Sequence, residues 1–131
     1  MEKQIKILMI EDDPFFGKLC ARVLEDEGFL IALAKDGEQG LKKLEEERPD
    51  LVLLDIILPK MNGFEVLEGI RKNPDPELAG THVIILSNLY SEEEEKKARE
   101  LKADGYLVKA NTTSDELLKK VREVLAQGSG K

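Results

Sequence analysis

Five short apolar segments, separated by longer stretches with helical periodicity, are the feature that most limits how this chain can fold. Each segment has four or five residues, and most are rich in Ile, Val and Leu with little alternation between apolar and polar side chains. That composition is typical of strands covered on both faces of a parallel sheet. We therefore predict five strands, at Lys6–Ile10, Leu30–Ala34, Leu51–Leu54, 83–86 and Gly105–Val108.

The stretches between these segments carry two signals of helices. Their apolar residues recur at intervals of three and four, as at Phe64, Leu67 and Ile70. Regular alternation of strand and helix predicts an α/β fold of the (βα)₅ type, with a single doubly wound, parallel five-stranded sheet covered by helices on both faces. Helix starts are marked by side chains that can cap the first turn. These are Asp13 before Pro14, Asp36 with Gln39, Asn62 with Glu65, Ser91 with Glu94, and Thr113 with Glu116.

Length and charge limit the classes of function. The chain has 131 residues, a formal net charge of −7 and one cysteine, Cys20. Its length suits one domain, which we place at residues 4–126, followed by a flexible tail or linker stub at 127–131.

The negative charge argues against direct binding of nucleic acid, which requires clustered Lys and Arg. No apolar run reaches the ~20 residues of a membrane span, and a lone cysteine fits a reducing compartment. We therefore expect a cytoplasmic domain that contacts neither nucleic acid nor membrane.

Polar residues with related chemistry follow four of the five predicted strands. The carboxyl ends of parallel strands meet at one edge of the sheet, where open α/β folds place their sites. Each residue alone is more often a cap, a turn residue or a surface charge, so only the joint pattern is informative. The residues are Glu11 and Asp12 after the first strand, Asp55 after the third, Ser87 and Asn88 after the fourth, and Lys109 after the fifth.

The acidic residues of this set predict a site for a hard divalent cation. Clustered carboxylates repel one another unless a cation lies among them. Oxygen ligands without cysteine or histidine favour Mg²⁺, with Mn²⁺ as the alternative. A carboxylate can also be the nucleophile in phosphoryl transfer, and a nearby hydroxyl and ammonium would contact the phosphoryl oxygens. The adjacent Asp13 is expected to cap the first helix rather than bind the metal.

Four stretches of the chain resemble the receiver domains of two-component response regulators, the CheY-like superfamily: ILMIEDDP, LVLLDIILPKMNGFEVL, VIILSN and GYLVKA. The resemblance covers about residues 4–126, and the DIILPKMNG segment is its most specific part. It implies a flavodoxin-like fold with strand order 2-1-3-4-5. It also implies a bacterial, cytoplasmic phosphorelay signalling domain rather than an enzyme, with Mg²⁺-dependent self-phosphorylation and autodephosphorylation.

The resemblance assigns the phosphoacceptor and the metal ligands. Asp55 would accept a phosphoryl group from the phosphohistidine of a sensor histidine kinase or a phosphotransfer protein. Glu11, Asp12, Asp55 and the backbone carbonyl of Ile57 would hold Mg²⁺, with Asp12 bound directly and Glu11 through water.

The resemblance also implies how phosphorylation is transmitted. Ser87 would contact the phosphoryl group, and Lys109 would pair with that group and with Asp55. Tyr106 matches an aromatic switch that turns inward when the Ser87 loop moves. The alternative for Tyr106 is an edge-strand aromatic that half covers the last helix. The switched surface would bind a downstream protein or a second receiver, giving a phosphorylation-dependent homodimer.

The sequence departs from the family pattern at three positions. Ala110 stands where a proline, usually in a cis bond, commonly follows the lysine; a trans bond is expected here because a non-proline cis peptide costs about 3 kcal/mol. Asn88 stands where a small residue usually follows the hydroxyl residue, here Ser87. Its larger side chain would either narrow the approach to Asp55 or hydrogen-bond a phosphoryl oxygen or the water that attacks the phosphoryl group. In either case it would tune the rates of phosphorylation and dephosphorylation. His82, often proline in the family, is expected at a strand edge with no chemical role.

Two other functions compete with the phosphoacceptor. An aspartyl-phosphate phosphatase commonly has an acid two residues after its nucleophile, but Ile57 stands at that position. A pseudo-receiver would act as an unphosphorylated interaction module, although the full set of acids and the lysine argue against it. A nucleotide site is not indicated, because the EDDPFFG stretch has a single glycine and cannot form a glycine-rich phosphate loop.

Overall fold

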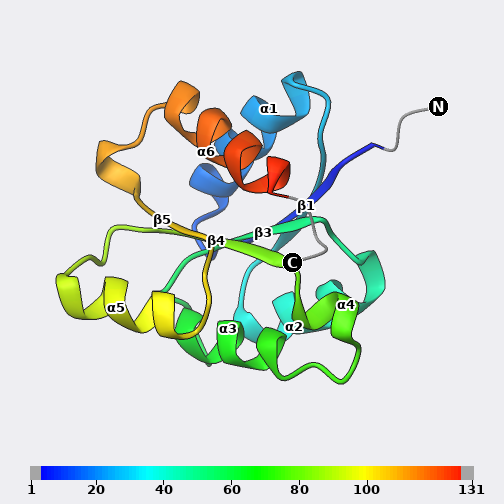
Figure 1. Ribbon diagram of the computed structural model, residues 1–131. Helices are drawn as coiled ribbons and strands as arrows, with labels where there is room; N and C mark the ends of the chain where they lie inside the picture. Colours follow the sequence, from blue (N-terminus) through cyan, green and yellow to red (C-terminus); the bar gives the residue numbers. More distant parts are fainter. Residues whose placement is uncertain (1–3, 128–131) are drawn as a thin grey trace.

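The structure is a computed structural model that describes residues 4–127. Five parallel strands form one sheet in the order β2-β1-β3-β4-β5, which confirms the predicted fold class. In Figure 1, α1 and α6 cover one face of this sheet, and α2, α3, α4 and α5 cover the other. The strands are β1 (Lys6–Ile10), β2 (Leu30–Ala34), β3 (Leu51–Leu54), β4 (His82–Ser87) and β5 (Gly105–Val108). The helices are α1 (Pro14–Asp26), α2 (Gly37–Glu47), α3 (Gly63–Arg71), α4 (Pro76–Ala79), α5 (Glu92–Glu100) and α6 (Ser114–Ala126).

Two hydrophobic cores lie on opposite faces of the sheet, because successive strand residues point to opposite sides. In β1, Ile7 and Met9 pack with residues of α1 and α6, while Leu8 and Ile10 pack with residues of the other four helices. The three central strands are buried on both faces as predicted, apart from Lys6 at the start of β1. The outer strands β2 and β5 are less covered, and Leu30 of β2 is 43% exposed. A strand at the edge of a sheet has a neighbour on one side only, so the helices cover it less completely.

All five predicted helix caps form. The Asn62–Glu65 and Thr113–Glu116 pairs are full capping boxes, in which side chain and backbone exchange hydrogen bonds. Gln39 differs, because its side chain accepts from the backbone N–H of Lys35 rather than from the capping residue. Acids fill the first turn of α5 and bases its last turn, as expected for charges that complement the helix dipole.

Three features were not anticipated from the sequence. The crossover from β3 to β4 contains a second, four-residue helix, α4, capped by Asp75. A short 3-10 turn, Lys109–Asn111, follows β5. Strand β4 extends one residue further at each end, so that His82 is its first residue, buried, with Nδ1 3.4 Å from Asp104 Oδ1. This contact lies at the amino end of the sheet, far from the predicted site.

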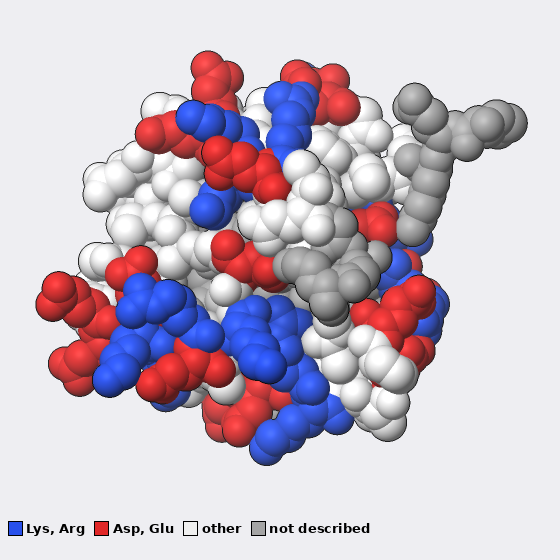
Figure 2. All heavy atoms as spheres, in the orientation of Figure 1, with Lys and Arg blue, Asp and Glu red and all other residues white. Residues whose placement is uncertain are grey.

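The surface carries mixed charge. On the face drawn in Figure 2, acidic and basic side chains are interspersed. Among the described residues, no helix combines the length and the hydropathy that a bilayer crossing requires. Of the predicted tail at 127–131, only Gln127 is described; it caps α6, and residues 128–131 lie outside the described part.

Candidate functional site

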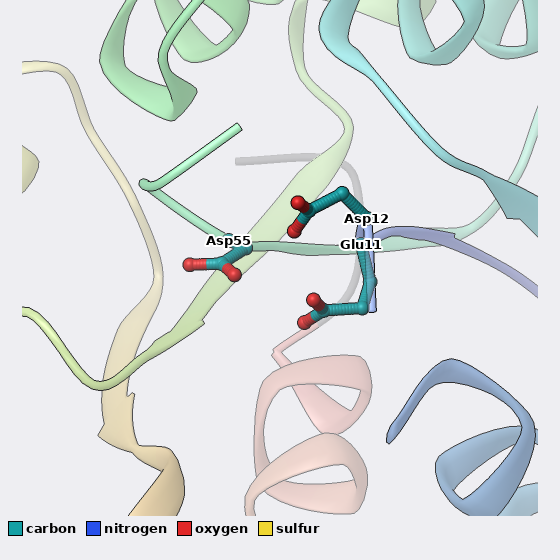
Figure 3. Close-up of side chains that lie close together, drawn as sticks. All are labelled: Glu11, Asp12 and Asp55. Carbon is teal, nitrogen blue, oxygen red and sulfur yellow. The ribbon is translucent and has the colours of Figure 1, made fainter. Parts of the chain in front are cut away.

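Three carboxylates converge at the carboxyl edge of the sheet. Strands β1 and β3 pair with Ile10 opposite Leu54, so the residues that follow them, Glu11 and Asp55, emerge side by side. One carboxylate oxygen from each of Glu11, Asp12 and Asp55 lies within 4.8 Å of the others, and Figure 3 shows the three side chains around a common space. Glu11 and Asp55 are buried, at 6% and 5% exposure, whereas Asp12 is exposed to solvent.

Lys109 brings a positive charge into this acidic cluster. Its ammonium lies 2.8 Å from Asp55 Oδ2 and 2.5 Å from Glu11 Oε1. The same ammonium lies 4.7 Å from the ring centroid of Phe16 in α1, a cation–π contact. Three carboxylates and one ammonium leave an excess of two negative charges at the site.

The environment shifts the pKa values of Glu11 and Lys109. Burial raises the pKa of the Glu11 carboxyl above its ordinary value, although its contacts with Lys109 and with the N–H of Asp13 act in the other direction. Burial also opposes the charged form of Lys109, but its polar contacts with Asp55 and Glu11 outweigh that effect and raise the lysine pKa. The lysine therefore stays charged at neutral pH, while Glu11 keeps its negative charge less readily than an ordinary glutamate.

One buried oxygen of this cluster is compensated by charge rather than by an aligned hydrogen bond. Glu11 Oε1 lies close to the Lys109 ammonium, but off the direction of a hydrogen bond, and among the described side chains no donor is aligned with it. The other oxygen, Oε2, accepts from the backbone N–H of Asp13 at 3.0 Å. Three carboxylates that each offer an oxygen to one common space, with no cysteine or histidine among them, fit a hard cation that binds oxygen.

The Asp55 side chain is held at both oxygens. Oδ1 accepts from the backbone N–H of Ile57 at 3.1 Å, while Oδ2 faces Lys109.

The loop from β3 to α3 is packed tightly against Gly63, whose N–H donates to Ile56 O at 2.8 Å. A Cβ at position 63 would lie 2.2 Å from the Asp55 carbonyl oxygen, so only glycine fits there. Sequence reasoning missed this role of Gly63, for which the only signal was a glycine directly after the capping Asn62.

Ser87 and Tyr106 both contact the loop that follows β4. Ser87 is fully buried, and its hydroxyl accepts from the N–H of Leu89 at 3.2 Å. The Tyr106 hydroxyl donates to the carbonyl of Leu89, and its ring meets the Tyr90 ring edge-on with 5.4 Å between centroids. Burial raises the pKa of Tyr106 to about 12. Tyr106 packs with the core on the α5 side, so the alternative in which it covers the last helix is wrong.

The two unusual residues of the site meet each other. The side-chain carbonyl of Asn88 accepts from the backbone N–H of Ala110 at 2.9 Å. The bond between Lys109 and Ala110 is trans, as expected, since residues 4–127 contain no cis peptide. The structure thus brings Glu11, Asp12, Asp55 and Lys109 together, and places Ser87 at the end of β4 and Asn88 in the loop that follows it.

Comparison with known proteins gives one consistent family. The family model described as "Response regulator receiver domain" matches residues 7–122. The chain is 34% identical over 109 residues to the chemotaxis protein CheY of Halobacterium salinarum, an alignment that covers 83% of this chain and 86% of that protein. It is 40% identical over 104 residues to the transcriptional regulatory protein CpxR of Escherichia coli, covering 79% of this chain and 42% of CpxR.

A solved structure agrees with this result. The CheY-like response regulator receiver domain protein of Methanospirillum hungatei superposes with a TM-score of 0.87 at 32% identity, covering 95% of this chain and 96% of that one. The chain thus spans most of a CheY but only about two fifths of a regulator such as CpxR.

Proposed function

The chain belongs to the family of response regulator receiver domains, and we propose that it accepts a phosphoryl group on Asp55 in a Mg²⁺-dependent reaction. The observation that carries this proposal is the position of Asp55 between a cation-binding cluster and a lysine. Its carboxylate belongs to the acidic group with Glu11 and Asp12, and one of its oxygens lies 2.8 Å from the Lys109 ammonium. A buried carboxylate in these surroundings is suited to attack a phosphoryl group. The carboxylate and the phosphoryl group are both negatively charged, and a bound cation on one side and Lys109 on the other can neutralise that charge.

Glu11, Asp12 and Asp55, with the backbone carbonyl of Ile57, would hold the metal ion. When bound, Mg²⁺ would neutralise charge on the carboxylates and on the phosphoryl oxygens. Asp12 is exposed and Glu11 is buried, so an ion entering from solvent would meet Asp12 first. Mn²⁺ is the alternative ion, because it accepts the same oxygen ligands.

The residues of this chain then perform one displacement. An oxygen of the Asp55 carboxylate attacks the phosphorus atom of a phosphohistidine, forming a P–O bond as the P–N bond breaks. The electron pair leaves on the imidazole nitrogen, which takes up a proton, and Asp55 becomes an acyl phosphate. Lys109 stays within reach of a phosphoryl oxygen because its ammonium already contacts Asp55. Ser87 would turn its hydroxyl from the Leu89 N–H toward the phosphoryl group.

This movement of Ser87 would reach the surface through Tyr106. The loop that contains Leu89 is bonded to the Tyr106 hydroxyl, so a shift of the loop changes the position of that ring. We propose that the altered surface of α5 and β5 binds a downstream protein or a second receiver, as a phosphorylation-dependent homodimer, in the cytoplasm of its cell. The phosphodonor would be a sensor histidine kinase or a phosphotransfer protein.

The test is intact-mass spectrometry after incubation with acetyl phosphate and Mg²⁺. We expect one phosphate on the wild type, none on Asp55→Asn and none after addition of a chelator. Failure of the wild type to take up phosphate would favour the pseudo-receiver, the alternative function. Sustained hydrolysis of a generic phosphate ester that is lost in Asp55→Asn would favour a phosphatase. NMR with beryllofluoride, which mimics a phosphoryl group, should move the amide signals of Asp55, Ser87 and Tyr106.

A further inference from the structure

Asn88 and Ala110 are joined by a hydrogen bond between two loops of the site. The side-chain carbonyl of Asn88 accepts from the backbone N–H of Ala110 at 2.9 Å. Asn88 directly follows Ser87, and Ala110 directly follows Lys109, so each partner is adjacent to a residue of the proposed site. The two loops leave neighbouring strands, in which Ser87 pairs with Val108.

The hydrogen bond sets a chemical requirement at each of the two positions. This bond requires an N–H at position 110, which a proline would not have. Ala110 lies in the first turn of the 3-10 helix Lys109–Asn111, where backbone N–H groups have no partner within the helix. Asn88 supplies that missing acceptor from outside the helix. A small residue at position 88 could not, because it has no side-chain carbonyl that reaches across.

The bond completes the restraints on the backbone of Lys109. On one side, Val108 pairs with β4. On the other, Thr112 donates its hydroxyl to Val108 O at 2.7 Å and its N–H to Lys109 O at 3.3 Å, which closes the turn on itself. Of these contacts beyond the strand, only the bond from Asn88 connects the turn to a different loop.

We infer that Asn88 is a positioning residue: through the N–H of Ala110 it holds the Lys109 turn so that the ammonium meets Asp55, and it couples this turn to the Ser87 loop. This inference rests on the proposed function, since Lys109 is being positioned for phosphoryl transfer. The Ser87 loop is tied to β5 at a second point, through the Tyr106 hydroxyl and the Leu89 carbonyl. A movement of Ser87 toward a phosphoryl group would therefore pull on Lys109 and on Tyr106 together.

The experiment compares phosphorylation rates with phosphoramidate and Mg²⁺ for wild type, Asn88→Ala, Ala110→Pro and the double variant. Asn88→Ala should slow phosphorylation by roughly three- to tenfold, the change that loss of one hydrogen bond produces. In the Ala110→Pro background, the same Asn88→Ala change should have no further effect, whatever the proline itself does, because the bond is already absent. Asn111→Ala is the matched control, since it makes the same substitution in the same turn without touching the bond.

Amide hydrogen exchange of Ala110 gives a readout that is independent of phosphate chemistry. Its N–H should be protected in the wild type, exposed in Asn88→Ala, and protected again in Asn88→Asp, which retains an acceptor oxygen. Protection that survives Asn88→Ala, a wild-type phosphorylation rate in that variant, or additive effects of the two substitutions would each overturn the inference. A wild-type protein that takes up no phosphate would instead overturn the proposed function, and with it the positioning role.

Discussion

The ammonium of Lys109 lies 2.8 Å from Oδ2 of Asp55, although 54 positions separate the two residues in the chain. The same ammonium contacts Glu11, so a single lysine pairs with two buried carboxylates that follow two different strands. This arrangement compensates part of the acidic charge and leaves the remainder for a cation. We therefore expect the lysine and a metal ion to act together on one cluster, and each can be tested by its effect on stability.

Lys109→Met should lower the free energy of unfolding of the metal-free protein at neutral pH by about 2 kcal/mol. This is below the ~3–5 kcal/mol for breaking a fully buried pair, because the lysine side chain is 14% exposed. Since the folded-state pKa of Lys109 is raised, its contribution is complete below the ordinary value of 10.5 and disappears as pH rises through the folded pKa. Urea unfolding measures the difference, with Lys119→Met, an exposed lysine, as the control. Equal midpoints for Lys109→Met and wild type at pH 7 would contradict the prediction.

Mg²⁺ should stabilise the wild type, by about 2.7 kcal/mol at 100 times its dissociation constant, and should stabilise Asp12→Asn much less. The reason is that Asp12 is one of the three carboxylates of the cluster. Asp13→Asn is the matched control: it removes the same charge one residue away, while asparagine retains the ability to cap α1. Thermal unfolding with and without Mg²⁺ measures both. Loss of the Mg²⁺ effect in Asp13→Asn, with retention in Asp12→Asn, would reverse the assignment.

Binding of Mg²⁺ should weaken with decreasing pH, beginning above the pH at which an ordinary glutamate is protonated. Burial raises the pKa of Glu11 from its ordinary value of 4.5, and a protonated carboxyl no longer offers its charge to the ion. In the metal-free protein the sign is opposite: a raised acid pKa destabilises the folded state at neutral pH, and protonation relieves this as pH falls. Titration calorimetry in buffers from neutral to acidic pH, with Glu11→Gln as reference, tests the prediction; identical pH dependence in both proteins would refute it.

Stability should fall in alkaline solution partly because of Cys20. Burial raises the pKa of its thiol from 9.0 to about 11. Between these values the thiol of the unfolded chain ionises while that of the folded chain does not, so the contribution of Cys20 to stability is constant below pH 9.0 and decreases up to about pH 11. Two units of pKa correspond to about 2–3 kcal/mol. Unfolding of Cys20→Ala should show a smaller decrease over this range, and equal slopes for both proteins would count against the prediction.

Gly63→Ala should destabilise the protein by about 1–3 kcal/mol and slow phosphorylation of Asp55. The added Cβ would lie 2.2 Å from the carbonyl oxygen of Asp55 and 2.7 Å from Ile56 Cα, so the backbone that carries the proposed phosphoacceptor would have to move. Gly17→Ala in α1 is the contrasting control. Its Cβ would meet only side-chain atoms at 3.9 Å, and alanine favours a helix by about 0.5–1 kcal/mol, so this variant should gain stability. If both variants unfolded alike, the close approach at Gly63 would not be the cause.

The sequence by itself determined the elements and most of their order in space. Five apolar segments became five strands, and each of the five predicted caps begins a helix, because strand composition and capping depend on residues within a few positions of each other. The rule that polar residues gather at the carboxyl edge then placed Glu11, Asp12 and Asp55 at one point. Helix α4 was missed although Asp75 before Pro76 is the same start signal as Asp13 before Pro14, because its four residues are too few to show helical periodicity.

Only the tertiary structure decided how these residues meet. The contact of Lys109 with Glu11 and the bond from Asn88 to Ala110 join different loops, and the close approach of Gly63 to the Asp55 carbonyl depends on how the loop between β3 and α3 folds back on itself. Such contacts depend on strand register, on the packing of loops and on the directions of side chains. Strand register, loop packing and side-chain direction are set by the whole fold, so no local pattern of residues predicts them.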